Sequence, residues 1–508
     1  MKNKQIKIGA FLSYLSIGVN IFAGLIYTPW MINQIGKSEY GIFTLVNSLI
    51  NLFLIDFGLS SAVSRYVSKY KAEKKEQKIN DFLGLVYKLY IIIDIIIFIA
   101  LLVIYFMIDN IYIKLSPVEL EKFKVVYIIA ATFSVINFPF ITFNGILNSY
   151  EKFIQIKIGD IIYRLLTIVL MVLSLAMGYG LYALVSVNAF AGIILMLYKF
   201  IIIKNNTKIK INYKYSDKKM YKAIFSFSFW TTISSIFQRL IFNITPTILG
   251  IVANSVSIAI FGLVVSLEGY VYNITSAING MFMPKISRIY AKDKNNPDIM
   301  PLMLKVGRFQ YFLNSLIVVG FVILGKQFVC LWMGNDYIDA YYGLCLVIIP
   351  GIFFNSLQIA NTAIIVKNKV KLQAMIQIIT GIVNVCCSFV LSKYYGVIGA
   401  SVSIFIAYSI RAILMHLVCK KVLNISIWYF IKHCYIKIGI SSIITLIFGV
   451  IINNIYIDYS WISLITKGFI LLLLFIISIL FIGLKKDERK SILNKVKYYI
   501  SKIIKHNP

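Results

Sequence analysis

The chain has 508 residues, of which 59% are apolar and only 14% are charged, and its mean hydropathy is +0.83. Soluble domains carry roughly 25% charged residues, so this composition excludes a soluble globular protein and indicates a membrane protein. The formal net charge of +31 does not indicate nucleic-acid binding, because the lysines lie in short breaks between apolar runs.

Apolar runs longer than the ~18 residues needed for a spanning helix recur along the whole chain. They predict an all-α integral membrane protein with fourteen transmembrane helices. The first run is too long for a signal peptide and lacks a small-residue cleavage site, so we expect it to be retained. The predicted spans are residues 8–31, 41–65, 82–107, 121–146, 157–177, 181–203, 222–250, 256–282, 306–331, 340–366, 372–392, 396–419, 428–452 and 461–484.

The distribution of lysines predicts the orientation of these spans. Lys2, Lys4 and Lys7 precede the first span and would hold the amino terminus in the cytoplasm. An even number of spans returns the lysine-rich tail, residues 485–508, to the same side. Residues 488–505 in this tail are typical of either an amphipathic helix on the inner leaflet or a solvated extension.

Landmarks in the first half of the chain recur roughly 210 to 225 positions later, which predicts an internal repeat. The matching pairs are Pro29 with Pro246, Tyr40-Gly41 with Phe261-Gly262, Ser64-Arg65 with Ser287-Arg288, Pro139 with Pro350, and Tyr179-Gly180 with Tyr395-Gly396. Six helices in each copy give two repeats that run in the same direction. The expected domains are residues 1–207, 208–424, two extra helices in 425–484, and the tail 485–508.

Prolines lie at equivalent places in the two copies. Pro29, Pro139, Pro246 and Pro350 each remove a backbone hydrogen bond and can bend the helix that contains them. Bent helices at equivalent positions favour a protein in which a central space opens and closes.

Charged residues within the spans are the candidate functional residues, because a charge at the bilayer centre costs roughly 2.5 to 3.5 kcal/mol. The candidates that face a substrate or a cavity are Asp56, Arg65, Lys88, Asp94, Arg239 and Glu268. Depth in the membrane predicts a pair between Asp56 and Lys88, and Arg239 is expected either to pair with Glu268 or to face a central cavity. For the second pair, structural and substrate-facing roles are equally open.

Other charged residues are expected to be structural. Asp160 and Arg164 are four residues apart, so they can form an ion pair along one helix face. Arg411, Lys437 and Lys467 are expected to extend toward the membrane interface.

Basic residues outnumber acidic ones within the spans, which favours an anionic cargo. Arginine suits phosphate because its planar guanidinium donates two hydrogen bonds at once, and the 34 tyrosines offer rings and hydroxyls of the kind that sugars need. The six cysteines and three histidines are scattered, so no metal, cofactor or disulfide framework is predicted.

The segment from Gly36 to Tyr70, "GKSEYGIFTLVNSLINLFLIDFGLSSAVSRYVSKY", resembles polysaccharide or oligosaccharide flippases of the multidrug/oligosaccharidyl-lipid/polysaccharide (MOP) exporter superfamily. The residues that match are Tyr40, Gly41, Asp56, Gly58, Leu59 and Arg65, whereas Arg239 and Glu268 are proposed from depth alone. The resemblance extends over about residues 8 to 420.

This resemblance implies two helical lobes arranged in a V, plus two extra helices, that open alternately to either side of the bacterial cytoplasmic membrane. The implied cargo is an oligosaccharide on an undecaprenyl diphosphate carrier, moved for surface polysaccharide biosynthesis. Membrane lipids, a coupling H⁺ or Na⁺, and a glycan polymerase or glycosyltransferase are the partners that would follow.

Two other functions remain open. A drug or metabolite antiporter of the same superfamily would use Asp56, Asp94 or Glu268 as proton or cation sites. A membrane glycosyltransferase or glycan polymerase is disfavoured, because no D-x-D, HExxH or glycine-rich phosphate loop is present and the predicted outer loops are short. We therefore expect a transporter rather than an enzyme.

Overall fold

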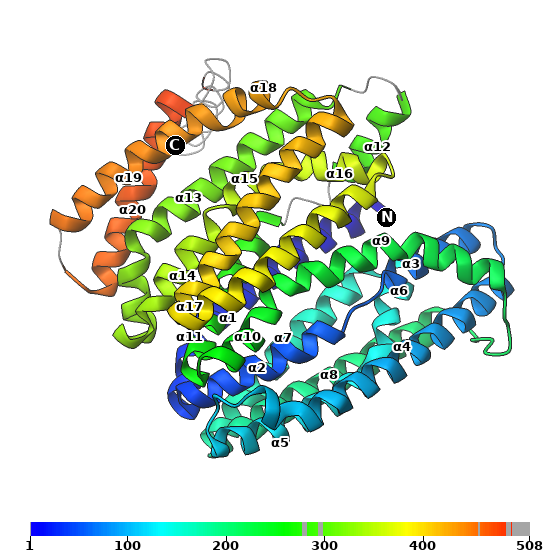
Figure 1. Ribbon diagram of the computed structural model, residues 1–508. Coiled ribbons are helices and arrows are strands. Elements are labelled where there is room, and N and C mark those ends of the chain that lie inside the picture. Colours follow the sequence, from blue (N-terminus) through cyan, green and yellow to red (C-terminus); the bar gives the residue numbers. More distant parts are fainter. Residues whose placement is uncertain (1, 277–281, 293–297, 456–457, 484–488, 490–508) are drawn as a thin grey trace, which may run out of the picture. The chain divides into compact units, whose positions relative to one another are not determined.

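The computed structural model describes residues 2–276, 282–292, 298–455, 458–483 and 489, and the regular elements in these ranges are all helical (Figure 1). The predicted all-α class is therefore confirmed. The tail, except for Arg489, lies outside the described residues, so its expected amphipathic helix stays a prediction.

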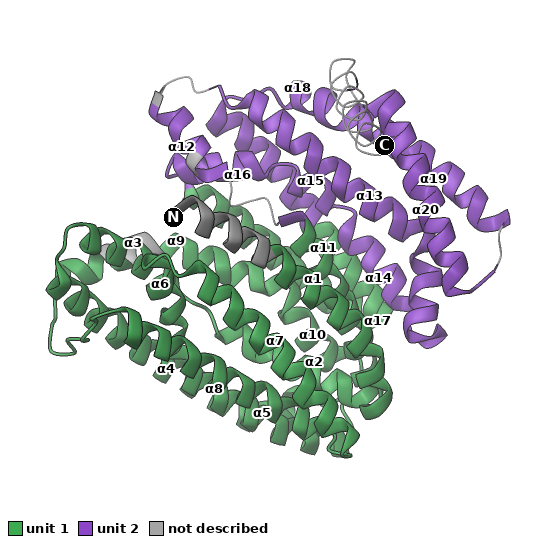
Figure 2. Cartoon of the chain, turned by 180° about the vertical axis from the view of Figure 1, so that it is seen from behind, with its two compact units in different colours: residues 1–274, 370–407 green, residues 275–369, 408–508 purple. Residues whose placement is uncertain are grey.

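The chain forms two compact units, each made of two separate stretches of sequence (Figure 2). Unit 1 comprises residues 1–274 and 370–407, and unit 2 comprises residues 275–369 and 408–508. The long helix α17 (Val370–Leu423) contributes to both units. The domain bounds expected from the sequence come from its internal repeat. The division into compact units does not test that repeat, so those bounds stay a prediction.

Unit 1 contains the first eleven α-helices and the first part of α17. Their bounds are α1 (Lys2–Ile35), α2 (Lys37–Phe53), α3 (Leu59–Ala72), α4 (Glu76–Ile111), α5 (Pro117–Asn137), the 3₁₀-helix η1 (Phe138–Ile141), α6 (Thr142–Ser149), α7 (Phe153–Ala176), α8 (Leu181–Asn206), α9 (Lys218–Phe242), α10 (Ile244–Val252) and α11 (Ser255–Ser276).

Unit 2 contains the remaining helices and the last part of α17. Their bounds are α12 (Met283–Lys292), α13 (Met300–Met333), the 3₁₀-helix η3 (Asn335–Tyr337), α14 (Ile338–Ile348), α15 (Gly351–Asn355), α16 (Gln358–Val366), α18 (Ile427–Ile431), the π-helix η4 (Lys432–Ile436), α19 (Lys437–Ile455), α20 (Trp461–Ser478) and the π-helix η5 (Ile479–Gly483).

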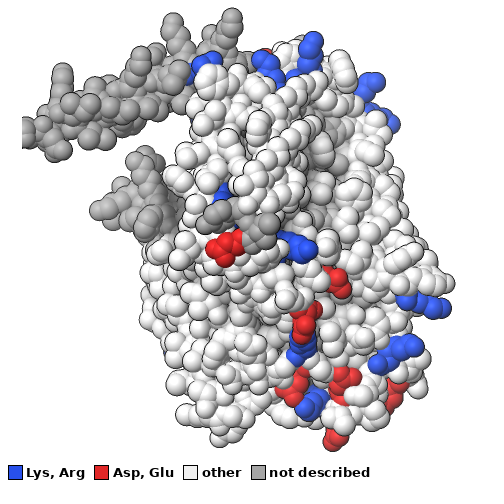
Figure 3. Space-filling model, turned by 90° about the vertical axis from the view of Figure 1, so that its left-hand side faces the viewer, with Lys and Arg blue, Asp and Glu red and all other residues white. Residues whose placement is uncertain are grey.

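Eleven helices in the described residues are long and apolar enough to cross a bilayer, or twelve if the bent pair α9–α10 is one span. Large apolar side chains stay exposed on them, such as Ile96 (61%) and Phe106 (70%) on α4. Such exposure is expected where a protein faces lipid. Charged residues are sparse over much of the face in Figure 3. The chain is therefore a multi-pass membrane protein.

Two places account for the difference between twelve spans, with the bent pair counted, and the predicted fourteen. The expected span 41–65 is interrupted, because α2 ends at Phe53 and α3 begins at Leu59. The expected spans 372–392 and 396–419 are merged in α17, whose backbone leaves the helical conformation at Gly396 (φ 51°, ψ −125°). The exact number fourteen stays a prediction.

The turns of unit 1 gather at two ends. At one end, Glu119 near the start of α5 accepts hydrogen bonds from the hydroxyls of Ser38 on α2 and Ser255 on α11. Lys122 of α5 forms an ion pair with Glu39 of α2. The α1–α2, α4–α5 and α10–α11 turns therefore lie together.

The other turns of unit 1 meet at a lysine-rich end. Asn212, in the α8–α9 connection, donates from its backbone N–H to the carbonyl oxygen of Asn80 on α4 (3.1 Å). Lys71 of α3 lies 4.2 Å from the ring centre of Tyr150 in the α6–α7 turn. Turns thus alternate between the two ends, as expected for helices that each cross the membrane.

Most of the prolines expected to bend helices lie at or beside interruptions. Pro139 lies in η1 between α5 and α6, and Pro350 directly precedes α15. Pro246 lies near the start of α10, just after the 40° bend between α9 and α10. Pro29 lies inside α1, which continues without a break.

Candidate functional site

A short non-helical segment, residues 54–58, separates α2 from α3. Within it, Phe57 (φ 51°) and Gly58 (φ 68°) have left-handed backbone conformations. Gly58 adopts this conformation without a steric penalty, whereas Phe57 pays a cost of order 1 to 3 kcal/mol. Contacts around the segment must therefore stabilise it.

Asp56 supplies such contacts. Its carboxylate accepts hydrogen bonds from the backbone N–H of Ser60 (3.2 Å), from the Ser60 hydroxyl (2.9 Å) and from the Tyr90 hydroxyl of α4 (2.6 Å). A carboxylate at the start of a helix satisfies free backbone N–H groups and interacts favourably with the helix dipole. Asp56 thus caps α3 and joins it to α4.

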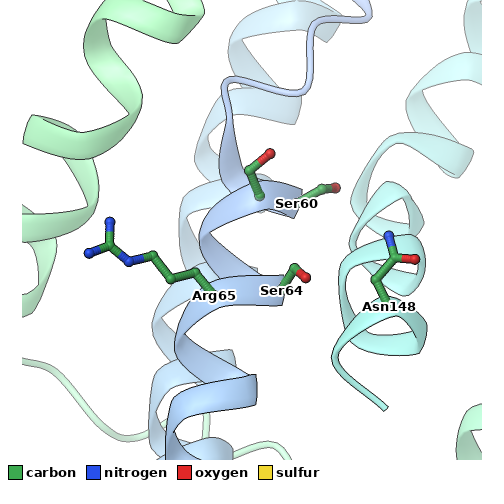
Figure 4. A pocket seen from close by; sticks show the side chains of 5 residues that line it. Ser60, Ser64, Arg65 and Asn148 are labelled. Carbon is green, nitrogen blue, oxygen red and sulfur yellow. The ribbon is translucent and has the colours of Figure 1, made fainter. Parts of the chain in front are cut away.

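A polar cavity of about 350 Å³ adjoins this capped helix. It is lined by Ser60, Ser61, Ser64 and Arg65 of α3 and by Asn148 of α6 (Figure 4). Figure 4 shows Ser64 on the side of α3 that faces Asn148, whereas Arg65 extends to the opposite side. The cavity therefore presents hydroxyls, an amide and a guanidinium.

Close packing between α3 and α6 positions these groups. A Cβ atom built on Gly145 of α6 would lie 2.6 Å from the backbone oxygen of Ser60 and 3.0 Å from Cβ of Val63. Only a glycine fits at this distance, as is common where membrane helices approach closely. The Ser60 hydroxyl also lies within hydrogen-bond distance (3.3 Å) of the carbonyl oxygen of Ile141 in η1.

The chemistry of the lining suits an anionic or hydroxyl-rich ligand. Arg65 is exposed and is the charged residue of the lining, which contains no carboxylate. A guanidinium offers paired donors to phosphate, and serine and asparagine side chains hydrogen-bond sugar hydroxyls. Asp56 lies behind the cavity, where Ser60 separates it from a ligand.

Arg239 contacts the same helix break from the α2 side. Its Nη1 donates a hydrogen bond to the backbone oxygen of Asn51, in the last turn of α2. Carbonyl groups at a helix end lack intrahelical partners and carry partial negative charge. In the described part of the chain, Arg239 makes this contact rather than the predicted pair with Glu268, because the end of α2 supplies an acceptor for the guanidinium.

The predicted pair between Asp56 and Lys88 is wrong. Lys88 Nζ instead donates to the backbone oxygen of Tyr215 in the α8–α9 connection (3.0 Å). Equal depth in two neighbouring helices did not fix which way each side chain points, and Tyr90 occupies the place next to Asp56.

Asp94 is not brought to the helix break either. It lies on α4, and its buried Oδ1 has no hydrogen-bond partner among the described residues.

The predicted pair between Asp160 and Arg164 is also wrong. Asp160 Oδ2 lies 3.3 Å from Lys157 Nζ, and Oδ1 lies 3.9 Å from Lys199 Nζ of α8. Lys157 on the same helix and Lys199 from α8 both occupy the carboxylate, and Arg164 extends toward α1.

Two cations that were expected to reach the membrane interface are buried in unit 2. Arg411 is 8% exposed, and its guanidinium lies 3.8 Å from the ring centre of Phe354. Lys467 is 3% exposed and donates to Gln327 Oε1 and Asn453 Oδ1, both at 3.1 Å. Lys437 is exposed, and its expected reach to the interface stays a prediction.

Several cavity residues were missed at the sequence level. Ser60, Ser61 and Ser64 follow directly after the "DFGL" motif, and Asn148 lies in a different span. The close spacing of three serines before Arg65 was a usable signal, because Ser60 and Ser64 lie one turn apart on one helix face. Nothing in the sequence indicated that Asn148 would lie opposite them.

Comparison with known proteins supports a role in polysaccharide biosynthesis. A family model described as polysaccharide biosynthesis protein matches residues 6–290, which include the whole helix break and cavity. A putative O-antigen transporter from Shigella flexneri is 24% identical over 249 residues, which are 48% of this chain and 55% of that relative. The chain thus aligns with about half the length of this curated relative.

Solved transporter structures share the fold. The lipid II flippase MurJ in an inward closed conformation has a TM-score of 0.70 at 16% identity, covering 92% of this chain and 97% of the other. An inward-facing multidrug resistance MATE family transporter of the MOP superfamily has a TM-score of 0.66 at 13% identity, covering 85% and 99%. The chain therefore has the fold of these transporters. Because the family model matches more than half of the sequence, the chain belongs to the polysaccharide biosynthesis protein family.

Proposed function

We propose that this protein is a flippase that moves a lipid-linked oligosaccharide, carried on undecaprenyl diphosphate, across the bacterial cytoplasmic membrane. The observation that carries the proposal is the cavity at α3 and α6, which is lined by three serines, Asn148 and Arg65, the last on the opposite side of α3 from Asn148. This lining suits a ligand that combines phosphate and sugar hydroxyls. The family match and the similarity to a flippase fold support the same cargo class.

The mechanism follows from the polarity of the cargo. A diphosphate and a sugar cannot enter hydrocarbon, so they pass through a hydrated space inside the protein while the polyprenyl tail stays in lipid. Arg65 binds phosphate through its two parallel donors, and the serines and Asn148 bind hydroxyls. No covalent step is required.

The helix break is where α2 and α3 change their relative orientation during this cycle. The left-handed backbone at Phe57 is strained, and Asp56 and Arg239 bind the helix ends on its two sides. Segments of this kind absorb dihedral changes in proteins that alternate between two states. Two lobes of six helices and two extra helices, fourteen spans in total, are the architecture within which this movement occurs.

Both termini lie in the cytoplasm. The support is the gathering of lysine-rich turns at one end of unit 1, which the distribution of positive charge in membrane proteins assigns to the cytoplasmic side. Cargo is then loaded near Arg65, because α3 leads to this end. A coupling H⁺ or Na⁺ drives the cycle, and a glycosyltransferase and a glycan polymerase act before and after it.

A cation-coupled drug or metabolite antiporter is the second candidate. The similarity to a MATE transporter fold favours it, and so does the carboxylate oxygen of Asp94 that has no hydrogen-bond partner among the described residues. In that case Asp94→Asn abolishes drug efflux and leaves surface glycan unchanged.

Deletion of the gene tests the two candidates directly. The flippase proposal expects loss of a surface polysaccharide and accumulation of its lipid-linked repeat units inside the cell, with recovery when the gene is restored. Unchanged polysaccharide together with altered drug sensitivity would instead establish the antiporter.

A further inference from the structure

Arg164 lies near the midpoint of α7 and extends toward α1 and α11. A Cβ atom built on Gly24 of α1 would lie 1.9 Å from the hydroxyl oxygen of Tyr270 on α11 and 3.5 Å from Arg164 Nη2. The absence of a side chain at Gly24 therefore leaves the space in which the Tyr270 hydroxyl and the guanidinium are both accommodated.

Polar atoms around Arg164 have unused hydrogen-bonding capacity. Arg164 Nε is buried without a hydrogen-bond partner among the described residues, and so is the hydroxyl oxygen of Tyr27 on α1. The hydroxyls of Tyr27 and Tyr270 both interact electrostatically with the guanidinium. Because buried donors are nearly always paired in folded proteins, the cluster can accept a hydrogen-bond partner that the described residues do not supply.

The charge of Arg164 is also uncompensated. Asp160, one turn earlier, is engaged by Lys157 and Lys199, so these four side chains carry three positive charges and one negative charge. No carboxylate pairs with Arg164 in the part of the chain that the structure describes. An unpaired cation at this depth of a bilayer is unfavourable unless water or an anion reaches it.

We propose that Arg164 and the hydroxyls of Tyr27 and Tyr270 form an anion-binding site inside unit 1, which takes a phosphate of the lipid-linked cargo. This inference rests on the proposed flippase function and adds a second phosphate contact to it. Arg65 lies toward the lysine-rich end, and Arg164 lies deeper in the membrane on another helix. The two arginines then bind the cargo at successive depths along its path.

Binding of undecaprenyl diphosphate to the purified full-length protein in phosphatidylcholine nanodiscs tests the site. We expect Arg164→Gln to weaken binding by about tenfold or more, the usual effect of losing a charged hydrogen bond. Tyr27→Phe, which removes one hydroxyl, should weaken it severalfold. Lys437→Gln, with the same loss of charge at an exposed position of α19, is the matched control and should bind like the unaltered protein.

Thermal unfolding of the same nanodisc samples without ligand separates a ligand site from a structural one. Removing an unpaired buried charge or hydroxyl leaves stability unchanged or raises it. Unfolding temperatures of Arg164→Gln and Tyr27→Phe at or above that of the unaltered protein are thus expected. Lower unfolding temperatures together with unchanged binding would show that Arg164 only holds the helices together, and would overturn the proposed site.

Comparison of ligands identifies the source of the phosphate and keeps the two proposals apart. We expect undecaprenyl diphosphate to bind more tightly than undecaprenyl monophosphate, and undecaprenol to bind weakly and equally to all variants. If the unaltered protein binds inorganic diphosphate as tightly as undecaprenyl diphosphate, the proposal that the bound phosphate belongs to a lipid is wrong. If it binds neither undecaprenyl diphosphate nor a lipid-linked oligosaccharide, the flippase function fails as well, whereas equal binding by Arg164→Gln contradicts only this site.

Discussion

Donors stabilise a carboxylate in a membrane-embedded segment, and Ser60 and Tyr90 supply them to Asp56 in the break between α2 and α3. Its contacts lie within one helix turn and one neighbouring helix. The carboxylate therefore stabilises the local backbone, since it caps α3 after a break in which Phe57 is strained. The same first turn of α3 presents Ser60 and Ser61 to the cavity.

Asp56→Ala should lower the free energy of unfolding by about 1 to 3 kcal/mol, because α3 loses its cap and Tyr90 loses a buried acceptor. Chemical or thermal unfolding in detergent measures the change. Combining Asp56→Ala with Tyr90→Phe should cost less than the sum of the single changes. Strict additivity of the two would show that the Asp56–Tyr90 hydrogen bond contributes nothing.

Arg65→Gln should reduce transport about tenfold or more, because a phosphate contact made by two parallel donors is lost. Arg65→Lys keeps the charge but not the planar fork, so it should restore only part of the rate. Recovery of surface polysaccharide in a deletion strain, at matched protein levels, is the readout. Full recovery of surface polysaccharide with Arg65→Gln would show that Arg65 does not bind the cargo.

At the scale of elements, the site depends on how closely α6 approaches α3. The backbone oxygen of Ser60 lies 2.6 Å from the position that a Cβ on Gly145 would take, so the two helices approach each other at the backbone. This contact sets the distance between Asn148 and the serines of α3, and with it the width of the cavity.

Gly145→Ala should therefore destabilise the protein by about 1 to 3 kcal/mol, because α6 must move away from α3. Gly18→Ala in α1 is a matched control, since nothing lies within 4 Å of its Cβ position. That change should be neutral or slightly stabilising, as glycine disfavours helix. Equal unfolding temperatures for the two variants would contradict the close approach.

The elements also show what the sequence could and could not predict. The positions of most spans followed from apolar runs, because length and hydrophobicity decide whether a segment enters the membrane. The break at 54–58 was not predicted, since it depends on the backbone at Phe57 and on contacts with Tyr90.

Side-chain pairing was the least predictable feature. Asp160 and Arg164 have the spacing of a helical pair, but the carboxylate of Asp160 contacts Lys157 and Lys199 of α8 instead. Lys467 could not be distinguished from an interfacial lysine, because its partners Gln327 and Asn453 lie in other helices. Spacing in one helix limits the possible contacts, whereas the neighbouring helix decides among them.

On the scale of the whole molecule, the alternation of turns between the two ends of unit 1 is the main support for the proposed topology. One end contains the cluster of Ser38, Glu119 and Ser255, and the other contains the lysine-rich turns. Positive charge collects on the cytoplasmic side of membrane proteins, which assigns the second end to the cytoplasm.

Labelling of single cysteines in intact cells tests this assignment. In a variant without the six native cysteines, Lys114→Cys should react with a membrane-impermeant thiol reagent, and Lys75→Cys should react only after the cells are opened. Both positions are exposed, so a difference in labelling reports the side of the membrane. The reverse pattern would invert the topology and place the Arg65 cavity toward the outside.

A flipping assay in proteoliposomes measures directly whether the protein moves a lipid-linked oligosaccharide between leaflets. The purified protein is reconstituted with an undecaprenyl diphosphate-linked oligosaccharide, and a glycan-modifying enzyme added outside measures how much lipid becomes accessible. We expect near-complete modification with the unaltered protein and modification of about half the lipid, the fraction already in the outer leaflet, without protein. With Arg65→Gln the accessible fraction should rise about tenfold more slowly than with the unaltered protein. An accessible fraction of about half with the unaltered protein, despite intact folding and an imposed H⁺ or Na⁺ gradient, would contradict the proposed function.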